Sequence, residues 1–545
     1  MVVIEFPNEK TRLCRLAVGF LAAVVICSAL SVSPLYASRD RKALQRAEKA
    51  LNDGDYETAE KLFRELLVKD AHDNAARLGL SYALLKQRFI QDAFDHAARV
   101  ILSEPLSARA HALLGSAILA SGDFRNSVEE FRTSLTIQEN ESLAIAGLAM
   151  IDFYENRLES AVKGLRRAVS LDSSEPDYIF NLGQAAARSE RYKEAADSYE
   201  RFLIIAPKTD ADRRARIRGL IDFLRYVGKQ GSLYVPAGEN KTTIPFEIVE
   251  NRPVLNVRVN GGKNVLRFVL DTGSGMSVVS EETAKKLGLR PVARGGLARA
   301  VGGGGKFEIV YGFLSSFEMG DVRVENVPVY IRHFYDSAVP VDGYIGLSLI
   351  SKYFASVDYG EKLFSLRRTS ESNIFDSGNL KISRNVAVAV PSTVIEIPLR
   401  TTSSGFLSGE VHLEGVEKPL NFILDTGASV SVVSERLAAE EDLSSYLEPT
   451  RMRVYGAAGI AEGVKSLLLP KVMLGTLTRE QISAAILDLE PVNETAGFTQ
   501  NGILGGNFLR HYRVSFDFQR GLVQLEPVKK KVSSGGSARP QEHLN

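Results

Sequence analysis

Residues 268–280 read FVLDTGSGMSVVS, and residues 422–434 read FILDTGASVSVVS. In each stretch a single carboxylate, Asp271 or Asp425, ends an apolar run and is followed by Thr-Gly. A carboxylate in apolar surroundings loses its hydration, so a protein rarely places one there without a use for its charge. The chain contains this arrangement twice, which indicates a duplicated unit.

The sequence around the two motifs repeats in the same order. Ser280 and Ser434 each precede Glu and are expected to cap a short helix. Short runs of β-branched and aromatic residues, broken by Gly and Asn, predict strands, and the Asn-Gly-Gly sequence at 260–262 predicts a hairpin turn. Later in each copy, DGYIGLSLISKYFASVDY at 342–359 corresponds to NGILGGNFLRHYRVSFDF at 501–518.

We therefore expect residues 243–368 and 393–528 to be two copies of one small all-β unit. A linker is expected at 369–392, and a disordered basic tail at 529–545. The last strand of each copy, LFSLRR or LVQLEP, is expected to close its own unit.

The first half of the chain has helical periodicity with a fixed repeat. Five positions lie 34 residues apart, and each is followed three residues later by Ala or Ser: Tyr56, Ile90, Phe124, Leu158 and Tyr192. Small residues at that phase let paired helices approach closely, and stacked pairs bury a continuous core.

The segments GDYETAEKLF, GDFRNSVEEF and ERYKEAADSY resemble the tetratricopeptide repeat, whose unit is a helix–turn–helix of about 34 residues. The resemblance implies an all-α superhelix of five repeats over 40–208, followed by a capping helix within 209–230. It also implies a protein partner or peptide in the groove of the array. The alternative is that the array is only a spacer.

Three parts recur in each β copy: an apolar strand ending in Asp-Thr-Gly, a glycine-containing loop, and an apolar–Gly segment. This order resembles an aspartic protease of the retropepsin type. The resemblance implies two closed β units, arranged as an intrachain pseudo-dimer, that meet at a shared site with Asp271 and Asp425 as the catalytic dyad. The apolar–Gly segments contain Gly346 and Gly505.

The resemblance assigns supporting roles to the residues that follow the aspartates. Thr272 and Thr426 would bond across the interface, and glycines would let the backbone turn tightly under the carboxylates. The supporting set is Thr272, Gly273, Ser274, Thr426, Gly427 and Ala428. The flap candidates, which would close over an extended peptide, are Gly302, Gly303, Gly304, Gly305, Gly456 and Gly459.

The implied chemistry is hydrolysis of a peptide bond by a water activated between two carboxyls that share one proton. No cofactor and no metal is expected. Two alternatives stay open: each copy pairs with its twin in a homodimer, or the units bind peptides without catalysis. The first copy has Gly275 and Ser348 where the second has Ser429 and Asn507.

Composition excludes other classes of function. The net charge is +1, so no global field favours nucleic acid. The GGGGK sequence at 302–306 is followed by Phe307, so the Ser or Thr of a phosphate-binding loop is missing. The sequence contains no H-E-x-x-H zinc motif and no G-x-S-x-G nucleophile motif.

The N-terminus predicts export. Basic residues precede an uncharged apolar stretch, Leu16 to Val32, and a cleavage point for a secretory signal follows Ala37. The alternative is an uncleaved inner-membrane anchor formed by residues 16–37. Both place the rest of the chain in the periplasm or outside the cell. The only cysteines, Cys14 and Cys27, lie in this segment, so no thiol chemistry is expected elsewhere.

Overall fold

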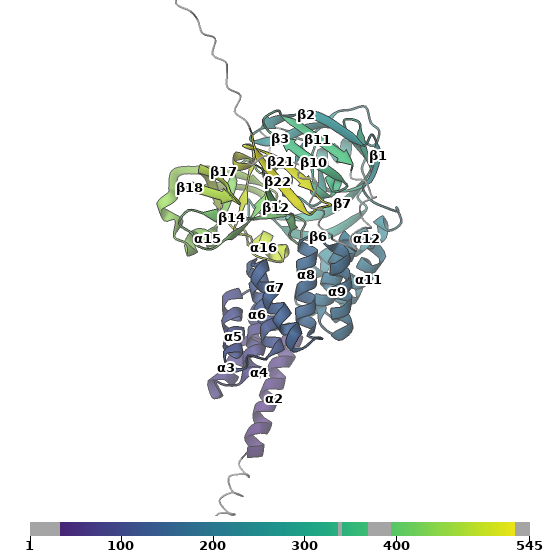
Figure 1. Ribbon diagram of the computed structural model, residues 1–545. Helices are drawn as coiled ribbons and strands as arrows, with labels where there is room; N and C mark the ends of the chain where they lie inside the picture. Colours follow the sequence, from purple (N-terminus) through teal and green to yellow (C-terminus); the bar gives the residue numbers. More distant parts are fainter. Residues whose placement is uncertain (1–32, 336–339, 369–393, 529–545) are drawn as a thin grey trace, which may run out of the picture. The chain divides into compact units, whose positions relative to one another are not determined.

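A computed structural model describes residues 33–335, 340–368 and 394–528 (Figure 1). Residues 1–32 of the predicted export segment, the predicted linker and the predicted tail lie outside the described residues. Residues 33–37 form the start of helix α2. No helix in the described part of the chain is long and apolar enough to span a membrane.

Helical hairpins form the first part of the chain. The second helix of each hairpin begins at one of the five positions that recur every 34 residues, so the predicted repeat is confirmed. The helices are α2 (Ser33–Asn52), α3 (Tyr56–Lys69), α4 (Asn74–Lys86), α5 (Ile90–Ser103), α6 (Ala108–Ser121), α7 (Phe124–Ile137), α8 (Ser142–Tyr154), α9 (Leu158–Leu171), α10 (Pro176–Arg188), α11 (Tyr192–Ile205) and α12 (Ala211–Val227).

The small residues of the repeat are buried because they mark the closest approach of paired helices. Ala59, Ala161 and Ala195 have no exposed surface. Helices α3 and α4 also pack closely, because a Cβ built on Gly79 would lie 2.4 Å from the ring of Phe63. The repeat pattern is therefore a packing requirement.

The chain divides into two compact units. One contains residues 1–118 and 129–141, and the other contains residues 119–128 and 142–545. This division does not follow the predicted domain boundaries, which remain predictions. The second unit joins the helices from α8 onward to all of the strands.

The first β copy is a sheet in the order β3-β4-β9-β5-β8-β7-β6. Strands β4 and β9, and strands β5 and β8, pair in parallel. The elements are β1 (Val235–Gly238), β2 (Lys241–Val249), β3 (Arg252–Val259), β4 (Leu266–Leu270), β5 (Ser277–Ser280), α13 (Glu281–Lys286), β6 (Ala293–Arg299), β7 (Lys306–Met319), β8 (Val322–Arg332), β9 (Gly343–Ile345), α14 (Leu347–Ile350), β10 (Tyr353–Asp358) and β11 (Leu363–Arg368).

The second copy repeats this order as β14-β15-β20-β16-β19-β18-β17. Its elements are β12 (Ile395–Pro398), β13 (Arg400–Thr401), β14 (Leu407–Leu413), β15 (Leu420–Leu424), β16 (Ser431–Ser434), α15 (Glu435–Glu440), η2 (Leu443–Tyr446), β17 (Leu447–Gly456), β18 (Gly459–Leu474), β19 (Leu477–Leu487), α16 (Glu490–Ala496), β20 (Gly502–Leu504), α17 (Gly506–Leu509), β21 (Tyr512–Asp517) and β22 (Leu522–Pro527). The predicted caps are confirmed: Ser280 and Ser434 accept from the Thr283 and Leu437 amides. The predicted turn at 260–262 is also confirmed, because it joins the antiparallel strands β3 and β4.

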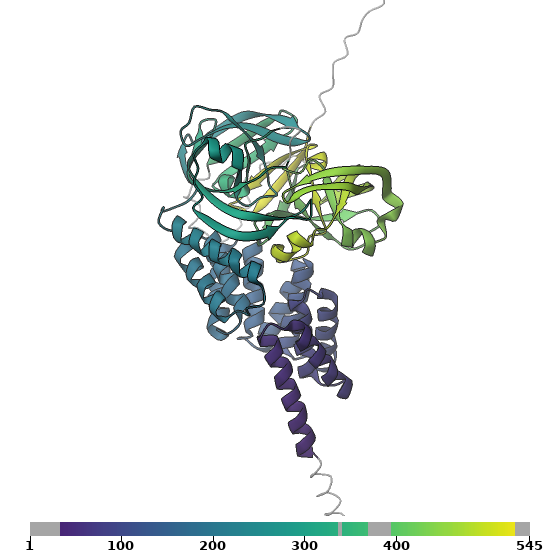
Figure 2. The ribbon, with the colours of Figure 1, turned by 180° about the vertical axis from the view of Figure 1, so that it is seen from behind.

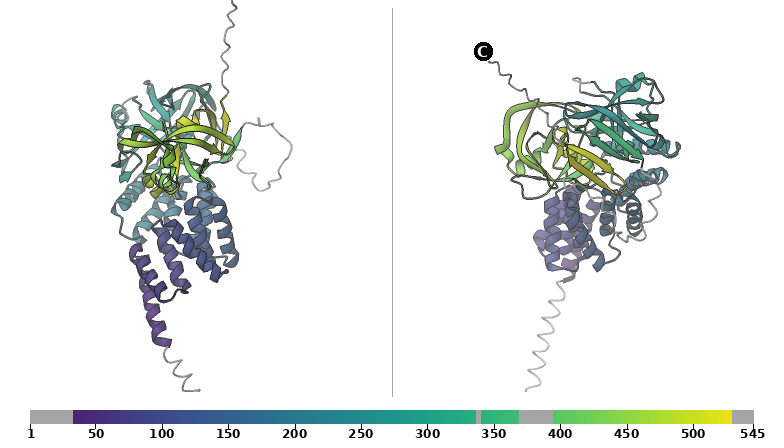
Figure 3. Two further views of the ribbon diagram at one scale, coloured as in Figure 1. Left: turned by 90° about the vertical axis from the view of Figure 1, so that its left-hand side faces the viewer. Right: turned by 45° about the horizontal axis from the view of Figure 1, so that its top comes forward.

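Each final strand pairs within its own copy, as expected: β11 pairs with β10 and β2, and β22 pairs with β21 and β12. The strands before them join the two copies into one shared sheet, in the order β12-β22-β21-β10-β11-β2 (Figure 3). Strand β10 pairs with β21, from Phe354 opposite Asp517 to Asp358 opposite Arg513. An unpaired edge strand exposes backbone donors and acceptors, and pairing the two edges satisfies both copies at once.

Helix α12 packs on the hairpin β6–β7 of the first copy. Its Phe223 ring stacks on Tyr311 of β7 with the ring centroids 4.3 Å apart, and Arg216 Nη1 donates to the Leu297 carbonyl at 2.9 Å. Gly219 allows the contact, because a Cβ there would lie 2.0 Å from the Arg294 carbonyl oxygen. The last helix of the array therefore supports one β hairpin directly.

Replacing Gly219 by alanine should loosen this hairpin. The added methyl group meets backbone that cannot rotate away, and overpacking of this kind costs about 1–3 kcal/mol. Hydrogen exchange of residues 293–299 should accelerate, while exchange of residues 447–456 stays unchanged. Arg218→Ala, on the exposed face of the same helix, is the control. Unchanged exchange of residues 293–299 in Gly219→Ala would contradict the packing.

Candidate active site

The two aspartates occupy equivalent places at the ends of strands. Asp271 follows β4, and its amide donates to the Ile345 carbonyl at 3.0 Å. Asp425 follows β15, and its amide donates to the Leu504 carbonyl at 2.9 Å. Each apolar–Gly segment therefore holds the aspartate of its own copy through the parallel strand pair beside it.

The threonines join the two loops reciprocally. The Thr272 amide donates to Thr426 Oγ1 at 3.1 Å, and the Thr426 amide donates to Thr272 Oγ1 at 3.0 Å. Each hydroxyl also donates to a carbonyl of the other copy, Leu424 or Leu270, at 2.6 and 2.7 Å. Both threonines are only 1% exposed, so these bonds form away from competing water.

The glycines bring the carboxyl groups together. A Cβ built on Gly273 would lie 2.4 Å from Cγ of Asp425, and a Cβ on Gly427 would lie 2.7 Å from Cγ of Asp271. Each carboxyl group thus lies against the glycine of the opposite loop, where no other residue fits. The structure places both aspartates in one site made by a single chain.

The carboxyl groups perturb each other. Burial raises the pKa of Asp271 well above its ordinary value, and the charge and hydrogen bond of Asp425 raise it further, while the Gly273 amide and the Arg332 charge act in the opposite direction. Burial also raises the pKa of Asp425, but hydrogen bonds from Asp271 and from backbone amides oppose the rise.

The shared proton is therefore favoured on Asp271. The amides of Gly427 and Ala428 donate to Asp425 Oδ1 at 2.7 and 3.2 Å, and such bonds stabilise a carboxylate. Burial raises the pKa of Tyr359 as well, and the Asp425 charge adds to that effect. Asp271 and Asp425 can therefore be present together as one neutral acid and one carboxylate.

Two glycine-rich hairpins, one from each copy, meet at their tips. Figure 2 shows the hairpin β6–β7 reaching toward the hairpin β17–β18 of the second copy. A Cβ on Gly302 would lie 2.7 Å from Gly456 Cα, and one on Gly303 would lie 2.5 Å from Gly459 Cα. Gly305 approaches the Ala458 carbonyl in the same way. The predicted flap residues therefore contact each other, and Gly304 lies at the same turn with φ of 62°.

Comparison with known families agrees with this geometry. Residues 255–349 and 409–508 match the family model described as aspartyl protease. Residues 44–101, 81–141 and 147–209 match the model described as tetratricopeptide repeat. The chain carries a tetratricopeptide repeat array followed by two aspartyl protease domains.

Solved structures resemble each half of the chain separately. The aspartic proteinase from Irpex lacteus aligns at 13% identity and a TM-score of 0.35, over 54% of this chain and 99% of its own. A thermophilic TPR protein of Thermus thermophilus aligns at 19% identity and a TM-score of 0.30, over 33% of this chain and 98% of its own. A search of curated proteins gave no match.

The two protease domains differ for a structural reason at one position. A Cβ on Gly275 would lie 3.0 Å from the Ser404 carbonyl oxygen, so a side chain there would require the loop 402–405 to shift by a few tenths of an ångström. Arg188 of α10 holds that loop by donating to Thr401 Oγ1 and to the Thr402 carbonyl, both at 2.8 Å. Burial lowers the pKa of Arg188 to about 10. No sequence pattern signals this contact.

The second difference, Asn507 in place of Ser348, changes the hydrogen bonds beneath the Asp-Thr-Gly loop. Asn507 accepts from the Ser431 amide and hydroxyl at 3.0 and 2.8 Å and donates to the Ser483 carbonyl. Ser348, which takes the place of Asn507 in the first copy, is too short to bridge in this way. The Gly346 and Gly505 amides nevertheless donate to equivalent hydroxyl groups, those of Ser277 and Ser431. Ser274 donates to the Met276 carbonyl, whereas Ala428 has no hydroxyl.

Sequence reasoning missed Arg332, whose charge acts on Asp271. The one available signal is the comparison of the copies, since the corresponding residue of the second domain is Leu487. No group of three His, Cys, Asp or Glu side chains that could hold a metal ion occurs among the described residues.

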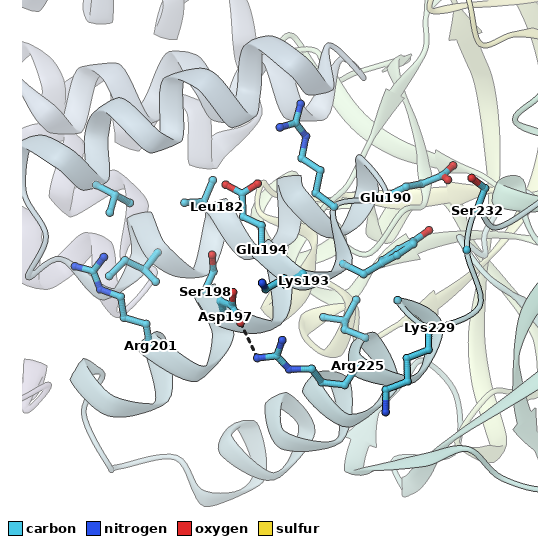
Figure 4. Close-up of a pocket in the computed structure, with 17 residues that line it drawn as sticks. Leu182, Glu190, Lys193, Glu194, Asp197, Ser198, Arg201, Arg225, Lys229 and Ser232 are labelled. Atoms are coloured by element: carbon cyan, nitrogen blue, oxygen red, sulfur yellow. Dashed lines mark hydrogen bonds and ion pairs between the residues drawn. The ribbon is translucent and has the colours of Figure 1, made fainter.

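A second candidate site lies in the repeat array. Helices α10, α11 and α12 and residues 228–232 line a pocket of about 1020 Å³ (Figure 4). Charged side chains of both signs surround it, and Arg225 donates to Asp197 at 2.6 Å across it. This pocket is the candidate binding site of the array.

Replacing Thr272 by alanine should weaken the junction of the two domains. The change leaves the Thr426 amide and the Leu424 carbonyl without partners, and a buried unsatisfied group costs about 1–3 kcal/mol. Native-state hydrogen exchange of residues 422–434 measures the loss in the full chain. Thr272→Ser keeps the hydroxyl and should be near wild type. Equal protection in Thr272→Ala and wild type would refute the role of these bonds.

Proposed function

We propose that the protein is an exported aspartic endopeptidase of the retropepsin type that cuts a protein substrate recruited by its repeat array. The observation that carries this proposal is the pair of carboxyl groups, Asp271 and Asp425, which share one site between two reciprocally bonded loops. The two long flaps, one from each domain, support the retropepsin type because the flap is duplicated with the rest of the fold.

The chemistry follows from the single shared proton. The ionised carboxyl takes a proton from a bound water, and the resulting hydroxide attacks the scissile carbonyl carbon. The protonated carboxyl donates to the carbonyl oxygen as its charge develops. The carbon–nitrogen bond then breaks, and the amine leaves with a proton from the dyad. The flaps hold the peptide extended and exclude bulk water.

An intrachain dyad is favoured over a homodimer with two symmetric sites. The surface that each Asp-Thr-Gly loop offers to a twin is already covered by the other loop of the same chain, through the reciprocal threonine bonds. A non-catalytic scaffold is the other alternative. It would have no use for two carboxyl groups whose proximity opposes ionisation of the second.

Recruitment and export complete the proposal. The pocket lined by α10, α11 and α12 is the part of the array that we assign to a peptide or protein partner. Export to the periplasm or the cell exterior rests on the apolar N-terminal pattern, cleaved after Ala37 or kept as an inner-membrane anchor by residues 16–37. No nucleic acid, cofactor or metal enters the proposed reaction.

Single substitutions distinguish the two arrangements of the dyad. With one intrachain site, Asp271→Asn and Asp425→Asn should each lower kcat/KM on denatured protein by more than about 10²-fold, because acid–base catalysis is lost. With two intermolecular sites, each variant would keep partial activity. Asp222→Asn, on the exposed face of α12, is the control. No cleavage by folded wild-type chain at any pH from acidic to neutral would contradict the enzymatic role.

The raised pKa of Asp271 also predicts that this aspartate, although needed for activity, lowers the stability of the fold at neutral pH. An unfolded aspartate has a pKa of about 3.9, and the folded pKa of Asp271 is raised. Between these values the folded state binds more protons, so stability falls as the pH rises. Asp271→Asn should therefore melt at a higher temperature than wild type at neutral pH, and the difference should vanish at a pH below the unfolded pKa. A lower midpoint at neutral pH would contradict the raised pKa.

A further inference from the structure

Arg332 is a cation beside the dyad with unused hydrogen-bonding capacity. It is the last residue of β8 and pairs in register with Ser280 of β5. Its guanidinium lies over the ring of Phe307, which closely follows the glycine turn at the tip of the first flap, 5.1 Å from the ring centroid. Its Nε is buried without a hydrogen-bond partner in the described part of the chain.

The neighbours of Arg332 do not neutralise it. Burial lowers its pKa, while Tyr344, Asp271 and Tyr335 act in the opposite direction. Of these three, only Asp271 is a carboxyl group, and it belongs to the dyad. A half-buried guanidinium whose buried Nε has no partner destabilises the fold, so a purely structural role would leave that cost unbalanced.

The second domain shows that the fold does not require a cation here. The corresponding residue, Leu487, pairs in register with Ser434 and is 7% exposed in an apolar cluster. Leu487 also lines a cavity of about 720 Å³ together with the tip of the first flap. Two copies of one fold thus present a cation on one side of the dyad and an apolar side chain on the other.

We propose that Arg332 selects substrate peptides that carry a carboxylate side chain on the side of the scissile bond that lies against the first domain. This inference rests on the proposed peptidase function and names its substrate class. A planar guanidinium can donate two parallel bonds to a carboxylate, and a partly desolvated site strengthens them. Cleavage sites should therefore be asymmetric, with Asp or Glu at one position on one side of the cut and no acidic preference at the mirror position.

The test uses the full chain and a library of peptides from a denatured protein extract, with cleavage sites read by mass spectrometry. The wild type should enrich Asp or Glu at one subsite. A cleaved peptide and its Glu→Gln counterpart should then differ by about tenfold or more in kcat/KM, because a charged hydrogen bond is involved. In Arg332→Met the ratio should fall to about one, and in Arg332→Lys it should be intermediate.

Arg323→Gln is the matched control. Arg323 lies near the start of the same strand, is exposed, and pairs with Glu325 at 3.1 Å, so the Glu-over-Gln ratio should stay at the wild-type value. An unchanged ratio in Arg332→Met, or no acidic preference in wild type, would overturn the inference. Removing this half-buried cation should not lower the melting temperature, whereas removing a structural arginine would do so.

The pH dependence of kcat/KM gives a second test, because it would be the same in Arg332→Met if Arg332 had only a structural role. The groups that face Asp271 are Asp425 and Arg332, and the positive charge of Arg332 favours the ionised form. Without that charge the dyad loses its first proton at higher pH, so the acid limb of kcat/KM should move upward in Arg332→Met. An acid limb that stays in place would contradict the proximity of the two groups.

Direct binding separates failure of this inference from failure of the enzymatic role. If the wild type cleaves nothing, two synthetic heptapeptide pools, identical except for Glu or Gln at the central position, are equilibrated with the full chain. Preferential retention of the Glu pool by wild type, lost in Arg332→Met, would support the carboxylate site without catalysis. Equal retention of both pools would overturn it.

Discussion

The reciprocal hydrogen bonds between Thr272 and Thr426 are the constraint on which the site depends. They are buried, and they link the backbone of each loop to the side chain of the other. Because the threonines fix the loops, the carboxyl groups that precede them are held close enough to share a proton. The sheet shared by the two copies gives the same junction a broad base, since β10 and β21 pair directly.

The helical array makes a duplicated fold asymmetric. Helix α12 packs on the flap of the first domain, whereas Arg188 of α10 holds the loop 402–405 of the second domain. That loop in turn lies against Gly275 in the first Asp-Thr-Gly loop. The array therefore contacts the two domains in different ways, and the two flaps differ in the support they receive. The exchange of Arg332 for Leu487 adds a chemical asymmetry beside the dyad.

The sequence predicted the elements whose signal is local or repeated. The dyad loops were predictable because two copies of one motif could be aligned residue by residue. The helix starts were predictable because packing imposes a fixed spacing on small side chains. The glycines of the flaps were predictable as a loop, although only the structure shows that Gly302 and Gly456 touch.

Features set by pairing between distant segments were not predictable. The sequence of β10 does not show that this strand pairs with β21 of the other copy, because that pairing depends on which strand edges the two folded copies leave free. The contact of Gly219 with Arg294 is likewise invisible in either segment alone. Arg332 resembles any polar residue at the end of a strand until its burial and the absence of a partner for its Nε in the described chain are known.

Native mass spectrometry with a peptide inhibitor tests the central claim most directly. The inhibitor carries a secondary hydroxyl in place of the scissile carbonyl, so it occupies the position of the water between the carboxyl groups. One chain, alone, should bind one inhibitor molecule, and Asp271→Asn should bind it far more weakly. Inhibitor bound only to species that contain two chains would contradict a dyad assembled within a single chain.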